Sequence, residues 1–343
     1  MSAPALAVSC HAFVRALKLI LLLVLAPAVL NAAPPPGYYA TAEGRSGAEL
    51  RMALHIILTN ASVVPYSSSG PDTSDALRVL DEDPANTNNV ILIYARRSEP
   101  KANFGTTAGW NREHLWPNSY GLDSHEPSYS DLHNLRAADA TVNSTRGNKF
   151  YDISATNSPG YKLPSSPEAP LTSTDSDSWE PPAEVKGDIA RAIFYMATRY
   201  TGDRANEPAL FITDATGQIA ATTNLMGRLT TLLRWHFAAP VDDRERLRND
   251  LVFDRYQHNR NPFVDRPEWV ALAFSPELVV SQEPPSVRIL WPAEFSDAVL
   301  ESSPTFLTAT WIVVTNVPTL LSNRLSVVLP DPSQPRFFRL RLN

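Results

Sequence analysis

Apolar residues recur at helical spacing in several stretches of the chain. After Ser46 the apolar positions fall on one helical face, and Glu49 stands three residues beyond the serine, which is the pattern of a capping box. A second, stronger stripe ends shortly before Gly202, a residue type that commonly stops a helix. These patterns predict helices over residues 46–59, 184–200, 224–237 and 242–257.

Other stretches have the pattern of strands and loops. Residues 90–94 (VILIY) are a short apolar run typical of a buried strand, whereas 154–182 is rich in Ser, Pro and Thr and predicts a long exposed loop. Beyond about residue 274, and after a linker signal at 282–285 (QEPP), the apolar runs become short and β-branched. We therefore divide the chain near residue 280. The strands predicted beyond that point are 286–291, 298–302, 310–315, 325–329 and 337–342.

The first 33 residues have the pattern of a secretory signal peptide. Arg15 and Lys18 precede the apolar run 19–30, and small residues at 31–33 offer a cleavage site. The alternative is a membrane anchor, but a run this short, interrupted by a proline, falls below the ~20 apolar residues that a spanning helix needs. The only cysteine, Cys10, lies in this segment. We therefore expect a secreted or periplasmic protein without disulfides, and no membrane span once the signal is cleaved.

Composition and charge narrow the class further. The 343 residues are 43% hydrophobic and 19% charged, which is typical of a folded protein with about two domains. The net charge of −6 excludes a generally basic nucleic-acid-binding surface, so any site for a polyanion is a local basic pocket. We assign 1–33 to the signal peptide, 34–280 to an α+β domain and 281–343 to a small β-rich module.

Residues that could carry chemistry are concentrated between positions 111 and 148. The stretch 111–117 (NREHLWP) puts a guanidinium and a carboxylate beside His114, and 131–135 (DLHNL) and 139–148 (DATVNSTRGN) follow. A zinc peptidase of the H-E-x-x-H type is disfavoured, because no second histidine stands at the required offset. A serine hydrolase is disfavoured because the chain has no G-x-S-x-G motif.

Metal-assisted hydrolysis of a phosphodiester is the remaining interpretation. This reaction needs an imidazole to deprotonate water, a hard cation held by oxygen ligands, and an arginine to meet the phosphate. Glu113, His114 and Asn143 supply the first two requirements. The arginine is one of three residues, Arg112, Arg136 or Arg146.

These stretches resemble the endonuclease I family of secreted and periplasmic nonspecific bacterial nucleases. Two further blocks agree with it, 181–196 (PPAEVKGDIARAIFYM) and 259–265 (NRNPFVD), so the resemblance covers residues 45 to 270. It implies a ββα-metal (His-Me finger) core with several helices, with His114 as the general base and Glu113 and Asn143 as ligands of one Mg²⁺. The sequence departs from the family at Ala137, where proline is common, and in lacking the disulfides of some members.

The local pattern sets conditions on this site. Adjacent strand residues point to opposite faces, so Glu113 and His114 share a site only where the strand ends, and the tryptophan and proline just beyond them fit a strand end. Asn143 is expected on a short helix between about residues 137 and 146, stopped by Gly147. Arg146 is our candidate for contacting the phosphate.

Structural interpretations of the same residues stay open. Asn143 could be a surface amide of its helix, Glu113 could pair with Arg112, and Arg146 could form a surface salt bridge. The two polar residues at 133–134 (HN) are interpreted as hydrogen-bonding groups that hold the hairpin, and Arg260 is a weaker phosphate candidate.

The function that we expect is Mg²⁺-dependent, sequence-nonspecific endonuclease activity on DNA, with RNA as a second candidate substrate. Residues 90–150 hold seven basic and six acidic side chains, so positive potential is at best concentrated near the site. The sequence pattern offers no aromatic platform for stacking bases. The alternative is a catalytically silent extracellular binding protein that acts through its C-terminal β module.

Overall fold

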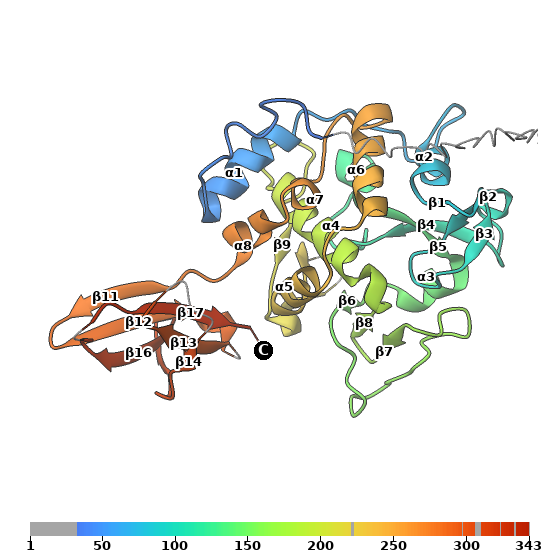
Figure 1. The fold of residues 1–343 in the computed structure, drawn as a ribbon. Helices are drawn as coiled ribbons and strands as arrows, with labels where there is room; N and C mark the ends of the chain where they lie inside the picture. Colours follow the sequence, from blue (N-terminus) through green and yellow to red (C-terminus); the bar gives the residue numbers. More distant parts are fainter. Residues whose placement is uncertain are drawn as a thin grey trace, which may run out of the picture. The chain divides into compact units, whose positions relative to one another are not determined.

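The computed structural model describes residues 33–220, 223–296, 298–305, 310–322, 324–332 and 334–342 (Figure 1). Both the predicted signal peptide and Cys10 lie outside these residues, apart from position 33 at the end of the signal. Among the helices of the described part, none has the length and apolar character to cross a membrane. The described residues contain helices and several small sheets, which is the mixed α+β class expected from the sequence.

Helix α4 (Lys186–Arg199) lies at the centre of the core. Eleven of its 14 residues are buried, so it is covered on more sides than the single predicted stripe implies. It packs against α1 (Gly47–Leu58), α5 (Leu229–Ala238) and α7 (Pro262–Asp265), and α8 (Glu268–Phe274) in turn contacts α1 and α5. The predictions of α1 and α4 are confirmed, whereas α5 begins five residues later than its predicted start.

Two helix starts show where the local prediction was right and where it was wrong. Ser46 is the N-cap of α1, but its side chain makes no capping hydrogen bond, so the predicted capping box is absent. A capping box occurs instead at α2 (Thr73–Leu80), where the Asp72 side chain accepts from Ser74 N at 2.7 Å and Asp72 N donates to Asp75 at 3.1 Å. Helix α6 (Asp243–Arg255) begins after Asp242, as its predicted range requires.

An antiparallel hairpin followed by a helix holds the residues singled out in the sequence. Strand β4 (Trp110–His114) pairs with β5 (Leu135–Asp139), and α3 (Ala140–Arg146) follows β5 directly. Gly147 ends this helix with φ 60°, a backbone conformation that glycine adopts easily, as predicted.

Short strands form the remaining sheets before residue 279. Four of the five residues in the run 90–94 are buried and Ile91 is half-buried, but only the first two residues belong to a strand. The segment 154–182 was predicted to be an exposed loop, and this is partly wrong because it contains β7 (Ser173–Thr174), β8 (Ser178–Glu180) and a series of buried polar side chains. These sheets are β1 (Glu82–Asp83), β2 (Asn86–Ile91) and β3 (Ser98–Pro100); β6 (Phe150–Tyr151), β8 (Ser178–Glu180) and β7 (Ser173–Thr174); and β9 (Phe211–Ile212) with β10 (Leu225–Met226).

The C-terminal residues form two small sheets. Their strands are β11 (Val279–Glu283), β12 (Ser286–Pro292), β13 (Val299–Ser303), β14 (Ile312–Val313), β15 (Thr319–Leu321), β16 (Arg324–Pro330) and β17 (Phe337–Arg341). One has the order β11-β12-β16-β15 and the other β14-β13-β17. The residues predicted as a linker are instead part of a hairpin, because β11 pairs with β12 across Pro284 and Pro285. Strand β15 was also missed. The division of the chain at 280 stays a prediction.

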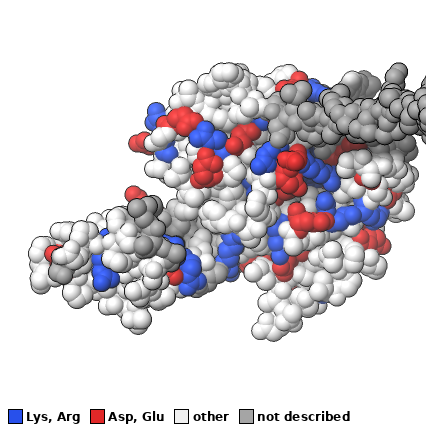
Figure 2. All heavy atoms as spheres, in the orientation of Figure 1, with Lys and Arg blue, Asp and Glu red and all other residues white. Residues whose placement is uncertain are grey.

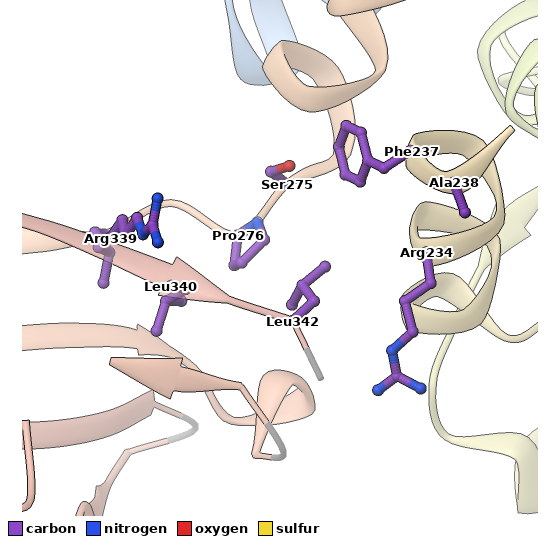
Figure 3. A pocket seen from close by; sticks show the side chains of 9 residues that line it. Arg234, Phe237, Ala238, Ser275, Pro276, Arg339, Leu340 and Leu342 are labelled. Carbon is purple, nitrogen blue, oxygen red and sulfur yellow. The ribbon is translucent and has the colours of Figure 1, made fainter. Parts of the chain in front are cut away.

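Neither the surface charge nor the pocket in Figure 3 indicates a functional site outside the β4–β5 hairpin and α3. Figure 2 shows acidic and basic side chains interspersed over the viewed face, so a nucleic acid would find no uniformly basic surface there. Figure 3 shows a pocket lined by side chains from α5, from the segment after α8 and from β17. None of the candidate site residues lines this pocket.

Candidate active site

The β4–β5 hairpin places Glu113 and His114 at the end of a strand. In the register of the hairpin, Glu113 lies opposite Arg136 and His114 opposite Leu135, and β4 ends at His114 as predicted. Asn134 fixes the chain just beyond this end, because its side chain accepts from Trp116 N at 2.7 Å and donates to Trp116 O at 3.1 Å. The role predicted for Asn134, holding the hairpin, agrees with these bonds.

Glu113 is buried, and one of its carboxylate oxygens is held by two donors. Its Oε1 accepts from the Tyr94 hydroxyl at 2.7 Å and from Arg146 Nη1 at 2.7 Å, while only 2% of the residue is exposed. Burial raises the pKa of Glu113, and the Arg146 guanidinium and the Tyr94 hydroxyl oppose that rise. Burial also raises the pKa of Tyr94 well above its ordinary value, so this hydroxyl keeps its proton and donates it.

Arg146 is committed to contacts inside the protein. Beyond Glu113, its Nη1 donates to His114 O and its Nη2 to Leu115 O, both at 2.8 Å, and its guanidinium lies 4.8 Å from the centre of the Tyr151 ring. The residue is 1% exposed. The interpretation of Arg146 as a surface salt bridge is therefore wrong, and the geometry gives no support to a direct phosphate contact. The pairing of Glu113 with Arg112 is wrong as well, since Arg112 donates to Thr73 Oγ1 at 3.1 Å and to the Tyr66 carbonyl.

The His114 ring is oriented by a backbone carbonyl. Its Nε2 lies 2.8 Å from Tyr129 O, and since a carbonyl oxygen only accepts, Nε2 carries the proton and Nδ1 has the free lone pair. The ring is stacked on Tyr66 at a centroid distance of 5.6 Å and lies 4.6 Å from the Tyr129 ring. Burial lowers the pKa of His114 to about 4, so the imidazole is neutral at physiological pH.

Asn143 projects from α3 back to β4. Its Nδ2 donates to Asn111 Oδ1 at 2.7 Å and to Arg112 O at 3.2 Å, so the half-buried amide is bonded to β4, and its interpretation as a surface amide of the helix gains no support. The start of α3 is fixed by Asp139, whose Oδ1 accepts from the backbone N–H groups of residues 141 and 142. The other Asp139 oxygen pairs with Arg97 Nη2 at 2.7 Å.

The remaining sequence candidates lie in structural contacts. His133 is buried against the Tyr195 ring, with Nε2 3.4 Å from Asn259 O, which agrees with its structural interpretation. Arg260 is 2% exposed and pairs with Asp250 and Asp265 at 2.6 and 2.7 Å, so the weak phosphate prediction has no support. Arg136 is also buried, and its Nη1 donates to the carbonyls of residues 133 and 135.

Five residues that contact the candidate site residues were not predicted from the sequence: Asn111, Tyr94, Tyr151, and Tyr66 and Tyr129 beside His114. Asn111 belongs to the motif 111–117 and stands two residues before Glu113, and therefore on the same face of the strand. That spacing would have identified it. Tyr94 and Tyr151 share a hydrogen bond between their hydroxyls at 2.6 Å, and their long sequence separation from Glu113 left no local signal.

The oxygens available around Asn143 and Glu113 fit a hard divalent cation. Among the described residues, the hydrogen bonds of Glu113 go to Oε1 and those of Asn143 come from Nδ2, which leaves Glu113 Oε2 and Asn143 Oδ1 without a donor. Carboxylate and amide oxygens are the ligand types that Mg²⁺ prefers, with water completing its shell. Within the same residues no group of three or more His, Cys, Asp or Glu side chains is arranged to hold a metal.

Comparisons with known proteins agree with the resemblance inferred from the motifs. The model of the family described as Endonuclease I matches residues 46–268. The extracellular ribonucleases of Bacillus amyloliquefaciens and Bacillus subtilis (strain 168) are each 45% identical to this chain over 234 residues, which is 68% of this chain and 76% of each relative. The matched region contains the hairpin, α3 and the central helix α4. The chain therefore belongs to the endonuclease I family of nucleases, which hydrolyse phosphodiester bonds.

Proposed function

We propose that this protein is a secreted, metal-dependent endonuclease whose β4–β5–α3 unit is a ββα-metal active site acting on DNA and RNA without sequence specificity. The observation that carries the proposal is the orientation of His114. The His114 Nε2–H group donates a hydrogen bond to the Tyr129 carbonyl, with 2.8 Å between nitrogen and oxygen. Nδ1 is therefore the nitrogen that can accept a proton from water. The complete set of Glu113, His114 and Asn143 favours catalysis over a silent binding protein.

Glu113 Oε2 and Asn143 Oδ1 are the protein oxygens that would hold the cation, with Mg²⁺ as the expected ion. When bound, a divalent cation stabilises the charge that develops on a phosphate undergoing attack. His114 deprotonates the attacking water, the new bond forms between that water's oxygen and phosphorus, and the bond from phosphorus to the 3′ oxygen breaks. The 3′ oxygen leaves with a proton from solvent.

We assign Arg146 a positioning role in place of the predicted phosphate contact. Its two terminal nitrogens bind Glu113 Oε1 and the carbonyls of residues 114 and 115, which belong to the backbone of the base itself and of the residue that follows it. Arg146 thereby ties the carboxylate to the end of β4. The half-buried Arg112, on the same strand face as His114, is the remaining member of the predicted arginine set near the base.

RNA is included as a substrate because both relatives are named extracellular ribonucleases. The same names support secretion, which the N-terminal sequence predicts independently. Water activated by His114 makes the ribose 2′ hydroxyl unnecessary, so we expect DNA to be cut as well. For the same reason, RNA products should end in a 3′ hydroxyl rather than a 2′,3′-cyclic phosphate.

The test compares supercoiled plasmid and a labelled RNA with Mg²⁺ or with EDTA. His114→Gln keeps an N–H donor for the Tyr129 carbonyl but has no basic nitrogen, so its rate should fall about 10²–10⁴-fold, the usual cost of losing a general base. His125→Ala removes an exposed histidine and is the matched control. Cleavage by folded His114→Gln at the parent rate, or cleavage that survives EDTA, would overturn the mechanism.

A further inference from the structure

The Asn143 side-chain amide can adopt two orientations, and only one of them allows it to bind a cation. An asparagine side chain has an oxygen, which binds a cation, and an NH₂ group, which repels one, and rotation by half a turn about the last side-chain bond exchanges them. A metal site that uses Asn143 therefore needs a neighbouring group that keeps the oxygen, and not the NH₂ group, facing the cation.

The contacts of Nδ2 fix the orientation of the Asn143 amide. Arg112 O lies 3.2 Å from the nitrogen assigned as Nδ2, and a backbone carbonyl only accepts, so the atom facing it is the NH₂ group. The same nitrogen lies 2.7 Å from Asn111, which must therefore present its oxygen. Both hydrogens of Nδ2 are used, and Asn143 Oδ1 is left as the atom available for a cation.

We infer that Asn111 is a positioning residue for the metal: it holds the Asn143 amide in the orientation in which Oδ1 can bind the cation. The inference rests on the proposed function, since it concerns the same cation. Asn111 is well placed for this task, because it lies on β4 opposite Ala138 and shares the strand face of Glu113. One strand therefore carries a metal ligand and the residue that orients the other ligand, which comes from α3.

Metal affinity measured without substrate tests the inference. Purified variants are titrated with Mn²⁺, and the EPR signal of the free ion reports binding. Asn111→Leu removes the acceptor at nearly constant volume and should weaken Mn²⁺ binding about tenfold, as the loss of a residue that orients a metal ligand commonly does. Asn111→Asp keeps an acceptor for Nδ2 and should bind within about threefold of the parent or more tightly. Asn88→Leu, an exposed amide of β2, is the matched control.

A double variant separates positioning from direct coordination. If Asn111 acts only through Asn143, then Asn111→Leu combined with Asn143→Ala binds Mn²⁺ no more weakly than Asn143→Ala alone. Additive losses would overturn the inference, because Asn111 would then contact the metal itself. Parent-like binding by Asn111→Leu would also overturn it, and so would equal losses in the Leu and Asp variants with lowered thermal stability. A parent protein that fails to bind Mn²⁺ and to cut nucleic acid would instead overturn the proposed function.

Discussion

Replacing Arg146 by methionine distinguishes a buried positioning residue from a substrate-binding one. Methionine fills a similar volume but cannot donate to Glu113 Oε1 or to the carbonyls of His114 and Leu115, which Arg146 binds at 2.7, 2.8 and 2.8 Å. The Glu113 carboxylate would then remain 98% covered with the Tyr94 hydroxyl as its remaining donor among the described residues. The change leaves one charge and two backbone oxygens buried without their partner.

The expected loss of stability follows from the Glu113 charge, which the substitution leaves buried without its ion-pair partner. Removing one member of a buried ion pair typically costs about 3–5 kcal/mol, a large share of the roughly 5–15 kcal/mol that stabilises a folded protein. At about 2–4 °C per kcal/mol for a domain of 150–250 residues, the melting temperature should fall by about 6–20 °C. Combining Arg146→Met with Glu113→Gln removes the stranded charge and should restore part of the loss.

Thermal unfolding followed by circular dichroism in EDTA measures the effect without metal. Arg45→Met is the matched control, because Arg45 is exposed and its ion pair with Glu49 spans 3.8 Å, so its melting temperature should stay near that of the parent. A residue that only met substrate phosphate would behave differently. If Arg146→Met kept the parent melting temperature and raised only KM, the positioning role would be refuted.

Two further predictions concern the metal and the C-terminal sheets. Glu113→Gln and Asn143→Ala should each lower nuclease activity in a way that high Mg²⁺ partly restores, because the defect is occupancy; rates unchanged by both substitutions and by EDTA would contradict a single-metal site. A chain ending at Leu278 should fold and cut nucleic acid at a comparable rate, because the residues of the proposed site and their contacts lie between positions 66 and 151 and the two C-terminal sheets use residues 279–341. Thermal unfolding and plasmid nicking measure this, and an inactive or insoluble shortened chain beside an active full chain would contradict it.

The elements of the site were predictable because their signals are local. Helix α3 has weak helix formers, yet Asp139 before it and Gly147 after it mark both ends, and the structure places the helix between them. The end of β4 at His114 was likewise predicted from the residues that follow it. Asn111 was accessible by the same logic, since alternation along a strand puts residues 111 and 113 on one face.

The partners of these residues were not predictable, because they come from distant parts of the chain. The hydroxyl that binds Glu113 belongs to Tyr94, which its apolar surroundings marked only as core, and nothing local to Arg146 indicates that it turns inward. Two local sequence signals also led to wrong predictions. Pro284 and Pro285 have the composition of a linker but lie between paired strands, and the capping pattern at Ser46 forms no capping bond.

The three atoms to which the proposed mechanism assigns chemistry are those that remain once the neighbouring hydrogen bonds are assigned. His114 gives Nε2 to a carbonyl and keeps Nδ1, Glu113 gives Oε1 to two donors and keeps Oε2, and Asn143 gives Nδ2 to two acceptors and keeps Oδ1. In each case the hydrogen-bonded atom fixes the side chain and, among the described residues, the second polar atom of the same group accepts no donor, so the proposed binding of substrate and metal would need little reorganisation. With Cys10 as its only cysteine, the chain has no disulfide within it, and side-chain hydrogen bonds that involve Tyr94, Arg146 and Asn111 help to hold the hairpin and α3 together.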